Sequence, residues 1–160
     1  LYTAICFAIP SAADPRLMGL AGTSFEAGNQ LKIITQLARH KTDRQRQAVV
    51  LQNGKHAVTR VRVVQELSGG AAAVVECKLE TGRTHQIRVH MSYVGHALIG
   101  DQTYSRRRKL AGQHTEQVAA FSRQALHAGL LGFKHPLTGR NLRFSAPLPK
   151  DMQELITLLS

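Results

Sequence analysis

The side chains best suited to chemistry are concentrated in one stretch, residues 80–104. It contains the run Gly-Arg-Thr-His-Gln-Ile-Arg-Val-His, which includes the two arginines Arg83 and Arg88. An arginine at the edge of a buried surface keeps its stem in apolar surroundings and offers a planar fork to a carboxylate, a phosphate or a base. The alternative is that both arginines are ordinary solvated surface residues. The spacing of their neighbours decides between these interpretations.

A helix beginning near Thr84 would position these side chains, because the Thr84 hydroxyl suits a helix cap. Within such a helix Gln86 and His90 share one face, and an apolar pair, Ile87 and Met91, occupies the next. Arg88 then lies between the two rows, near the boundary of the buried face. An arginine in this position can offer its guanidinium to a ligand, which makes the surface interpretation less favoured for Arg88.

The same residues resemble the signature segment of the RluA-type family of RNA pseudouridine synthases. Residues 82–90 carry the resemblance, together with Gly95-His96, Gly100-Asp101 and Tyr104 downstream. Residues 40–44, 54–59, 126–128 and 135–139 agree with the family pattern in the same order. The likeness covers most of residues 37–155 and, more weakly, residues 1–10.

The resemblance implies a reaction in which uracil is detached from its ribose and reattached through carbon, with no metal, nucleotide cofactor or redox partner. In the family an aspartate acts at the target nucleotide and an arginine pairs with that aspartate. A tyrosine lies against the base and a leucine-like residue packs its other side. A uracil within folded RNA must also be flipped out of its stack, at a cost of a few kcal/mol.

The resemblance places three of these roles in the chain. Arg88 matches the arginine that pairs with the aspartate and Tyr2 matches the tyrosine, so these are the predicted catalytic residues. Judged without the resemblance, Tyr2 and Leu126 would be ordinary core residues. The predicted substrate-binding residues are Leu126, at the base-packing position, with Arg83, His85 and Gln86.

The family aspartate has no counterpart in this sequence. The family carries it in a motif like His-Arg-Leu-Asp upstream of the tyrosine strand, whereas Asp14, Asp43, Asp101 and Asp151 stand in other contexts. We therefore expect residues 1–160 to be the C-terminal part of a single pseudouridine synthase catalytic domain. The upstream half with the aspartate motif would be absent, and would be a possible partner of this chain.

The charge of the chain favours an acidic partner. Its 21 Lys and Arg stand against 10 Asp and Glu, a formal net charge of +11. Neutralised phosphates release counterions, so a protein this basic commonly binds nucleic acid. The resemblance implies that this nucleic acid is structured ribosomal or transfer RNA. A membrane surface is disfavoured because the cations do not line one amphipathic helix. Unless they are merely solvated loop residues, the predicted RNA contacts are Arg39, Lys41, Arg44, Arg46, Arg106, Arg107, Arg108 and Lys109.

Other classes of site fit the sequence poorly. His85 and His90 are five residues apart and so do not share a helix face, neither cysteine belongs to a ligand pair, and we predict no metal site. A serine hydrolase would need a Gly-x-Ser-x-Gly elbow, which is missing. No apolar run reaches the length of about 18 residues that a membrane span needs, so we expect a cytoplasmic protein. Cys6 and Cys77 lie in apolar strand patterns and are predicted to be buried free thiols.

The expected fold class is α+β, a mixed, largely antiparallel sheet with a few flanking helices. Residues 11–35 are predicted to be loop, with one helical turn at 29–36, and a terminal helix should bury the stripe Met152, Leu155, Ile156 and Leu159. The predicted strands are 2–9, 57–64 in a hairpin with 48–51, 72–79, and 125–133 in a hairpin with 141–145 that joins the same sheet.

The sequence thus predicts an RNA pseudouridine synthase, present as a truncated C-terminal portion without its nucleophilic aspartate. The alternative is a catalytically inactive remnant that acts only as an RNA-binding module. An in-frame segment like His-Arg-Leu-Asp upstream in the parent gene would favour the enzyme, and a stop or a shifted frame there would favour the remnant.

Overall fold

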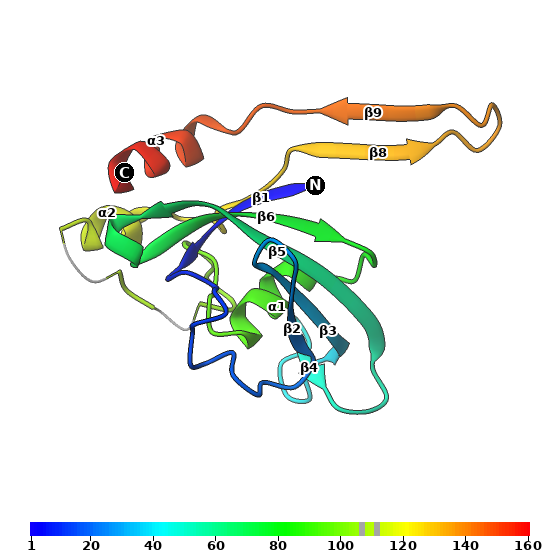
Figure 1. The fold of residues 1–160 in the computed structure, drawn as a ribbon, viewed down its shortest axis with the longest axis horizontal. Coiled ribbons are helices and arrows are strands. Elements are labelled where there is room, and N and C mark those ends of the chain that lie inside the picture. The colour runs from blue at the N-terminus through cyan, green and yellow to red at the C-terminus, as the bar shows by residue number, and fades with distance from the viewer. Residues whose placement is uncertain (106–107, 111–112) are drawn as a thin grey trace.

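The computed structural model describes residues 1–105, 108–110 and 113–160, folded as a sheet with helices on both faces (Figure 1). The elements in chain order are β1 (Tyr2–Phe7), β2 (Thr23–Glu26), β3 (Gln30–Arg39), β4 (Gln47–Val50), β5 (Lys55–Leu67), a 3-10 turn (Ser68–Gly70), β6 (Ala72–Leu79), α1 (Gln86–Tyr93), α2 (Thr115–Ala120), β7 (Leu126–Ala128), β8 (Leu130–Lys134), β9 (Asn141–Ser145) and α3 (Lys150–Leu159).

The main sheet follows the order β2-β3-β5-β6-β1-β7, and β4 pairs with the end of β3. Every pairing in this sheet is antiparallel, which confirms the predicted α+β class with a largely antiparallel sheet. β6 has the predicted boundaries, and it reads as a continuous apolar run because both of its faces are buried. One face of the sheet packs against α1, and the other packs against α2 and α3 (Figure 1).

Cys6 and Cys77 are buried free thiols, as predicted. Burial raises the pKa of both, to about 12 for Cys6, because the thiolate is penalised where water is excluded. The stripe of α3 is also confirmed, since Met152, Leu155 and Leu159 are buried and Ile156 packs against them. Within the described ranges, no helix is long and apolar enough to cross a membrane.

Residues 11–22 contain neither helix nor strand, as predicted for a loop, but residues 23–35 contain β2 and the start of β3, so the predicted helical turn was wrong. Leu31, Ile33 and Leu37 are buried at alternate positions, which is the period of a strand. The chain reverses between β2 and β3 through Gly28 and Asn29, both with positive φ, a conformation that these two residue types tolerate. The hairpin widens the sheet on the side away from β1.

The predicted hairpin between residues 48–51 and 57–64 was also wrong, because β3 lies between these two strands. Gln36 pairs with Val50 of β4 on one side and with His56 of β5 on the other. The connecting turn crosses the edge of β3 at Gly54, where an added Cβ would lie 2.8 Å from the Cβ of Gln36. The Gly54 N–H donates to the Gln36 side-chain oxygen at 2.9 Å, which fixes this crossing.

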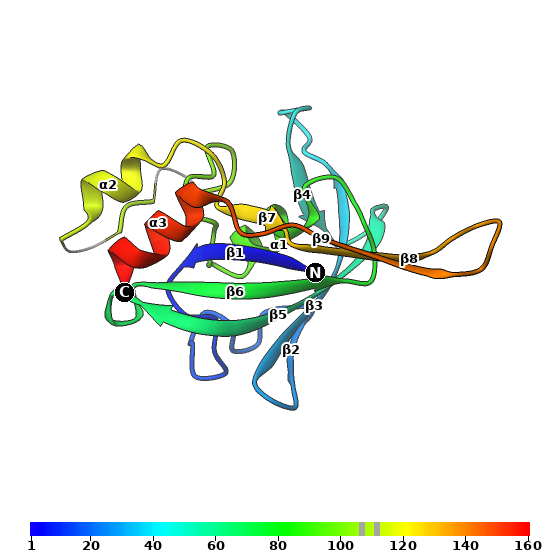
Figure 2. The same cartoon turned by 90° about the horizontal axis from the view of Figure 1, so that it is seen from above.

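The predicted C-terminal hairpin forms, but it does not join the main sheet. The short strand β7 pairs with β1, whereas β8 and β9 form a separate two-stranded sheet after Gly129. We call residues 130–145 the arm, which projects from the body (Figures 1 and 2). Leu131, Phe133 and Phe144 are exposed on the arm, and the two phenyl rings stack with centroids 5.9 Å apart.

His90 fastens α1 to the sheet through two neutral hydrogen bonds. Its Nδ1 lies 2.8 Å from the Thr59 hydroxyl of β5, and its Nε2 lies 2.8 Å from the Thr35 hydroxyl of β3. The side chain is buried, and burial lowers its pKa from 6.5 to about 4. The neutral imidazole is therefore part of the folded core.

This burial predicts a pH dependence of stability. The unfolded chain takes up a proton on His90 below its ordinary pKa of 6.5, whereas the folded chain does so only near 4, so stability falls as the pH drops between these values. The loss due to His90 should be about 3 kcal/mol. In urea unfolding, the free energy of unfolding of His90→Gln should fall by correspondingly less than that of the wild type when the pH is lowered from about 7 to about 4. His127→Gln should retain the wild-type loss, and an unchanged loss in His90→Gln would contradict the assignment.

Candidate functional site

The start of α1 is built differently from the prediction. The helix begins at Gln86, and the cap position is His85, whose φ of 56° is left-handed, so Thr84 is not the cap. The Gln86 side chain instead binds the turn before the helix: its oxygen accepts from the Arg83 N–H at 3.0 Å and from the Thr81 hydroxyl at 2.8 Å. Its amide nitrogen donates to the Val58 carbonyl and to the Thr59 hydroxyl in β5. Gln86 therefore uses its hydrogen bonds to hold the Arg83 turn against the sheet.

Arg88 forms a two-point ion pair with Asp101. Its Nε lies 2.7 Å from Oδ2 and its Nη2 lies 2.9 Å from Oδ1, and the Asp101 side chain is 0% exposed. Burial alone would raise the pKa of this carboxyl, but the hydrogen bonds from Arg88 and from the backbone N–H of Tyr104 outweigh it and hold the pKa below its usual range. The pair is consequently ionised and fixed in orientation.

The sequence analysis did not foresee Asp101 as a partner of Arg88. It placed Arg88 at the boundary of the buried face, where the structure has it, but it reserved the guanidinium for an aspartate outside the chain. The available signal was the Gly100-Asp101 turn, since Asp101 Oδ1 accepts from the backbone N–H groups of Thr103 and Tyr104. In the part of the chain that the structure describes, no acceptor is within hydrogen-bonding distance of Arg88 Nη1.

Tyr104 connects this ion pair to the loop of residues 40–46 and to β4. The guanidinium carbons of Arg88 and Arg46 lie 4.9 and 5.4 Å from the centre of its buried ring. Its hydroxyl accepts from the Gln47 N–H at 2.9 Å and lies 2.9 Å from His85 Nδ1. The hydroxyl and His85 Nδ1 share this hydrogen bond, and the tautomer of His85 decides which of the two donates. Burial, with a smaller effect of Arg88, lowers the pKa of His85 and favours its neutral form.

Tyr2 and Leu126 come together on the face of the sheet that α1 covers. In the register of β1 and β7, Tyr2 is opposite Ala128 and Ala4 is opposite Leu126, so Tyr2 and Leu126 are diagonal neighbours on one face. Both are half-buried against the core cluster that includes Ile87. We call Tyr2 and Leu126 the sheet patch. The structure thus places the predicted site residues in two groups, the sheet patch and the cluster around Arg88.

Arg83 is exposed, and its Nε donates to the His56 carbonyl at 3.0 Å. It lines a pocket of about 450 Å³ together with Arg39 and Lys55. Of the other predicted RNA contacts, Lys41, Arg44 and Lys109 are exposed, whereas Arg46 is half-buried beside Tyr104. Arg108 is exposed and donates to the Gly95 carbonyl. Arg106 and Arg107 lie outside the described residues.

Comparison with known proteins identifies the family. A family model described as RNA pseudouridylate synthase matches residues 1–93, more than half of the chain. The chain belongs to this family. The match includes Tyr2, Arg83 and Arg88 of the predicted site.

Individual relatives agree with this family and confirm the RluA-type resemblance. The chain is 50% identical over 124 residues to the ribosomal large subunit pseudouridine synthase D of Zymomonas mobilis, covering 77% of this chain and 38% of that protein. It is 49% identical over 120 residues to the uncharacterized RNA pseudouridine synthase YlyB of Bacillus subtilis, covering 75% of this chain and 36% of that protein. The chain therefore spans well under half the length of the curated relatives it matches.

Solved structures share the fold. Human RNA Pseudouridylate Synthase Domain Containing 1 aligns with a TM-score of 0.63 over 91% of this chain and 53% of that chain, at 24% identity. Human RNA Pseudouridylate Synthase Domain Containing 4 aligns with a TM-score of 0.60 over 98% of this chain and 61% of that chain, at 22% identity.

The Arg88–Asp101 pair should be required for stability. Arg88→Ala leaves the Asp101 charge buried without its partner, which should lower the free energy of unfolding by about 3–5 kcal/mol. Combining Arg88→Met with Asp101→Asn removes both charges and should recover most of the loss. Arg123→Ala is the matched control, because Arg123 also forms a two-point pair, with Asp151, but at the surface, where less than about 1 kcal/mol is expected. Equal losses in Arg88→Ala and Arg123→Ala, measured by urea unfolding, would contradict this role of burial.

Proposed function

We propose that the chain is part of an RNA pseudouridine synthase that converts uridine to pseudouridine in structured RNA, with ribosomal RNA as the substrate and transfer RNA as the alternative. The names of its relatives support ribosomal RNA. A cytoplasmic location belongs to the same proposal. The observation that carries it is the sheet patch, where an aromatic and an aliphatic side chain lie on one face and offer two apolar surfaces to a flipped uracil.

Arg88 is proposed to orient the catalytic aspartate. Its Nε and Nη2 already bind Asp101, so the remaining Nη1 would serve the incoming carboxylate. The Asp101 pair would then act as a brace that keeps the guanidinium plane from rotating. Gln86 would hold the Arg83 turn, and His85, with Nδ1 engaged by Tyr104, would present Nε2 to the substrate.

The aspartate itself is proposed to lie outside these 160 residues. Three of the four aspartates in the chain are tied to arginines: Asp14 to Arg16, Asp101 to Arg88 and Asp151 to Arg123. Asp43 accepts from the Gln45 N–H in the exposed loop. A nucleophilic carboxylate has to be free to reach the target nucleotide, so this engagement favours an external aspartate.

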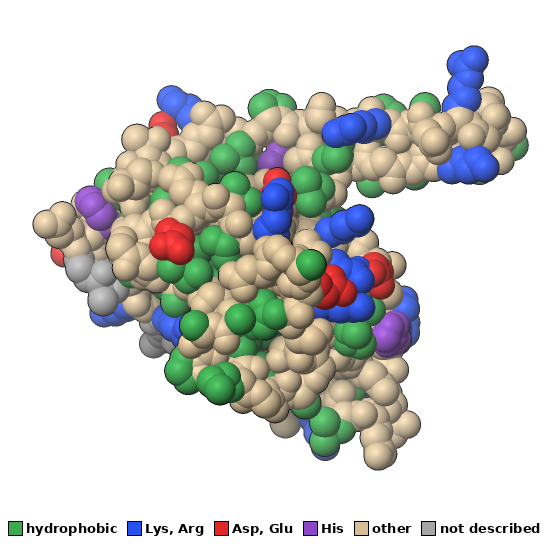
Figure 3. Space-filling view, viewed as in Figure 1, with side chains coloured by type: hydrophobic (Ala, Val, Ile, Leu, Met, Phe, Trp, Pro, Cys, Tyr) green, Lys and Arg blue, Asp and Glu red, His purple; other side chains and the backbone are tan. Residues whose placement is uncertain are grey.

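The arm is proposed as the surface on which the rest of the catalytic domain packs. Leu131, Phe133, Leu142 and Phe144 share one face of its ladder, and three of them are exposed. Figure 3 shows hydrophobic side chains at the surface of the arm. A two-stranded hairpin is marginal in water when its apolar face is uncovered. The chain spans only 38% and 36% of two relatives, which leaves ample sequence in those proteins for a segment that would cover the arm.

The proposed function is tested by an assay for pseudouridine in a ribosomal RNA transcript. The 160-residue chain is compared with the same chain extended upstream through a segment carrying a His-Arg-Leu-Asp-like motif. Activity only in the extended protein is expected. Activity in the chain alone would overturn the proposal of an external aspartate. Inactivity of both forms, with RNA binding retained, would favour the alternative of an inactive RNA-binding module.

The packing of the arm predicts a stability difference between the two forms. Phe133→Ser combined with Phe144→Ser should lower the melting temperature of the extended protein clearly, because those rings would be buried there, and should change the chain alone much less. Lys134→Ser combined with Arg143→Ser alters the opposite face of the arm and is the control. Equal shifts in both forms for the phenylalanine variants would rule out this docking surface.

A further inference from the structure

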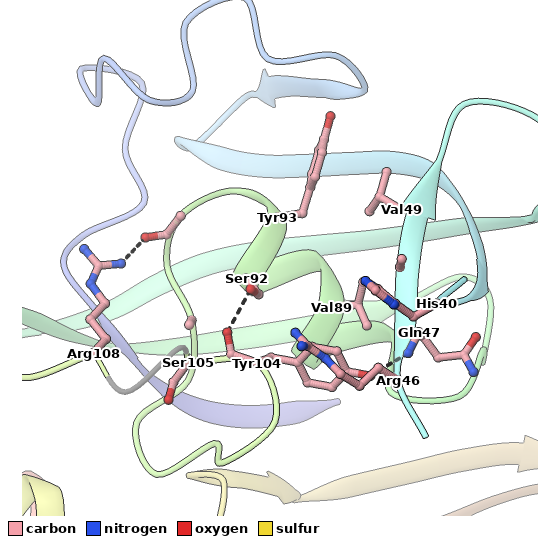
Figure 4. Close-up of a pocket in the computed structure, with 13 residues that line it drawn as sticks. His40, Arg46, Gln47, Val49, Val89, Ser92, Tyr93, Tyr104, Ser105 and Arg108 are labelled. Atoms are coloured by element: carbon pink, nitrogen blue, oxygen red, sulfur yellow. Dashed lines mark hydrogen bonds between the residues drawn. The ribbon is translucent and has the colours of Figure 1, made fainter. Parts of the chain in front are cut away.

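A pocket of about 610 Å³ lies between α1, β4 and the segment that follows α1 (Figure 4). Two of the predicted RNA contacts line it, Arg46 from the loop of residues 40–46 and Arg108 from the segment after α1, at opposite sides of the space in Figure 4. His40 lies beside Arg46, and none of the described lining residues is acidic. Arg46 and Arg108 are distant in sequence but line the same space, so the pocket suits an anion.

We propose that this pocket binds one nucleotide of the RNA strand outside the target uridine, with phosphate oxygens at Arg46 and Arg108. The proposal rests on the proposed function, since it assigns a second binding position for the same RNA. The pocket volume falls within the range of about 300–1,000 Å³ that small-ligand pockets occupy. Val49, Val89 and Tyr93 provide apolar walls for the ribose or the base.

Arg46 has a buried hydrogen-bond donor without an acceptor among the described residues. Its Nε is buried and has no hydrogen-bond partner in the described part of the chain, while its guanidinium lies against the ring of Tyr104. Buried N–H groups in native proteins are nearly always paired, so an orphan of this kind points to a missing ligand atom. A phosphate oxygen is the acceptor that an arginine binds most strongly.

The other two polar groups are held in place before any ligand arrives. Arg108 Nη1 donates to the Gly95 carbonyl, the guanidinium carbon lies 5.5 Å from the centre of the Phe7 ring, and no described residue accepts from Nε or Nη2. His40 Nδ1 accepts from the backbone N–H groups of Thr42 and Asp43, which places the His40 proton on Nε2 as a donor. Groups fixed in advance lose little conformational entropy on binding.

The test is the salt dependence of binding to a fluorescein-labelled oligouridylate, measured by anisotropy on the chain and its variants. Removing one cation that binds a phosphate of single-stranded RNA should reduce the slope of log K against log salt by about 0.7. Arg46→Ala and Arg108→Ala should each produce this change, and the double variant should produce about twice as much. Lys150→Ala removes an equal charge from α3 and should leave the slope unchanged.

Each result separates this proposal from the proposed function. Double substitution to Lys keeps both charges and should retain the wild-type slope, which distinguishes removal of the phosphate-binding charge from damage to the fold. If the wild-type slope of log K against log salt is steep and the double alanine variant has the same slope, the pocket does not bind the RNA strand, while the proposed function still holds. A wild-type slope near zero would reject RNA binding itself. Equal competition by inorganic phosphate alone would make the pocket a site for free phosphate and overturn its assignment to the RNA strand.

Discussion

The buried carboxylate of Asp101 is the constraint on which the candidate site depends. A charge that is 0% exposed is tolerated only with partners, and Asp101 obtains them from Arg88 and from the backbone N–H groups of Thr103 and Tyr104. The carboxylate therefore fixes the Arg88 guanidinium and the position of Tyr104 together. Tyr104 in turn positions His85 and Arg46, so one anion organises the segments that the proposed site combines.

Polar side chains also determine how α1 sits on the sheet. Gln86 and His90 both reach the Thr59 hydroxyl of β5, and His90 also reaches Thr35 of β3. Apolar contacts of Ile87 and Met91 supply burial but allow the helix to slide, whereas these buried hydrogen bonds are satisfied in one register only. The signature segment thus fixes the position of α1 on the sheet through Gln86 and His90, in addition to the role proposed for its other polar side chains.

The sequence predicted those helices and strands whose buried residues recur at a regular spacing. It failed where the structure depends on which strands pair with one another. The predictions for β6, for the faces of α1 and for the apolar stripe of α3 were correct, because the buried residues of each element recur with the spacing of a strand or a helix. β3 was missed although Leu31, Ile33 and Leu37 alternate, and its insertion between β4 and β5 cannot be read from local pattern. The sheet patch was predictable only through the resemblance, and the Asp101 partner of Arg88 required the fold.

Leu126 lies just three residues before Gly129, where β7 passes into the arm. The base of the arm is clamped by the backbone of Leu1, which exchanges hydrogen bonds with Leu130 at 2.6 and 3.1 Å, and by His127, whose ring nitrogen lies 3.1 Å from the Ala146 carbonyl. The arm is therefore joined to β7 both through the chain and by these hydrogen bonds. If the arm packs on the rest of the domain as proposed, that packing would also act on the strand that carries Leu126, so assembly of the domain and the position of the proposed base contact would be coupled.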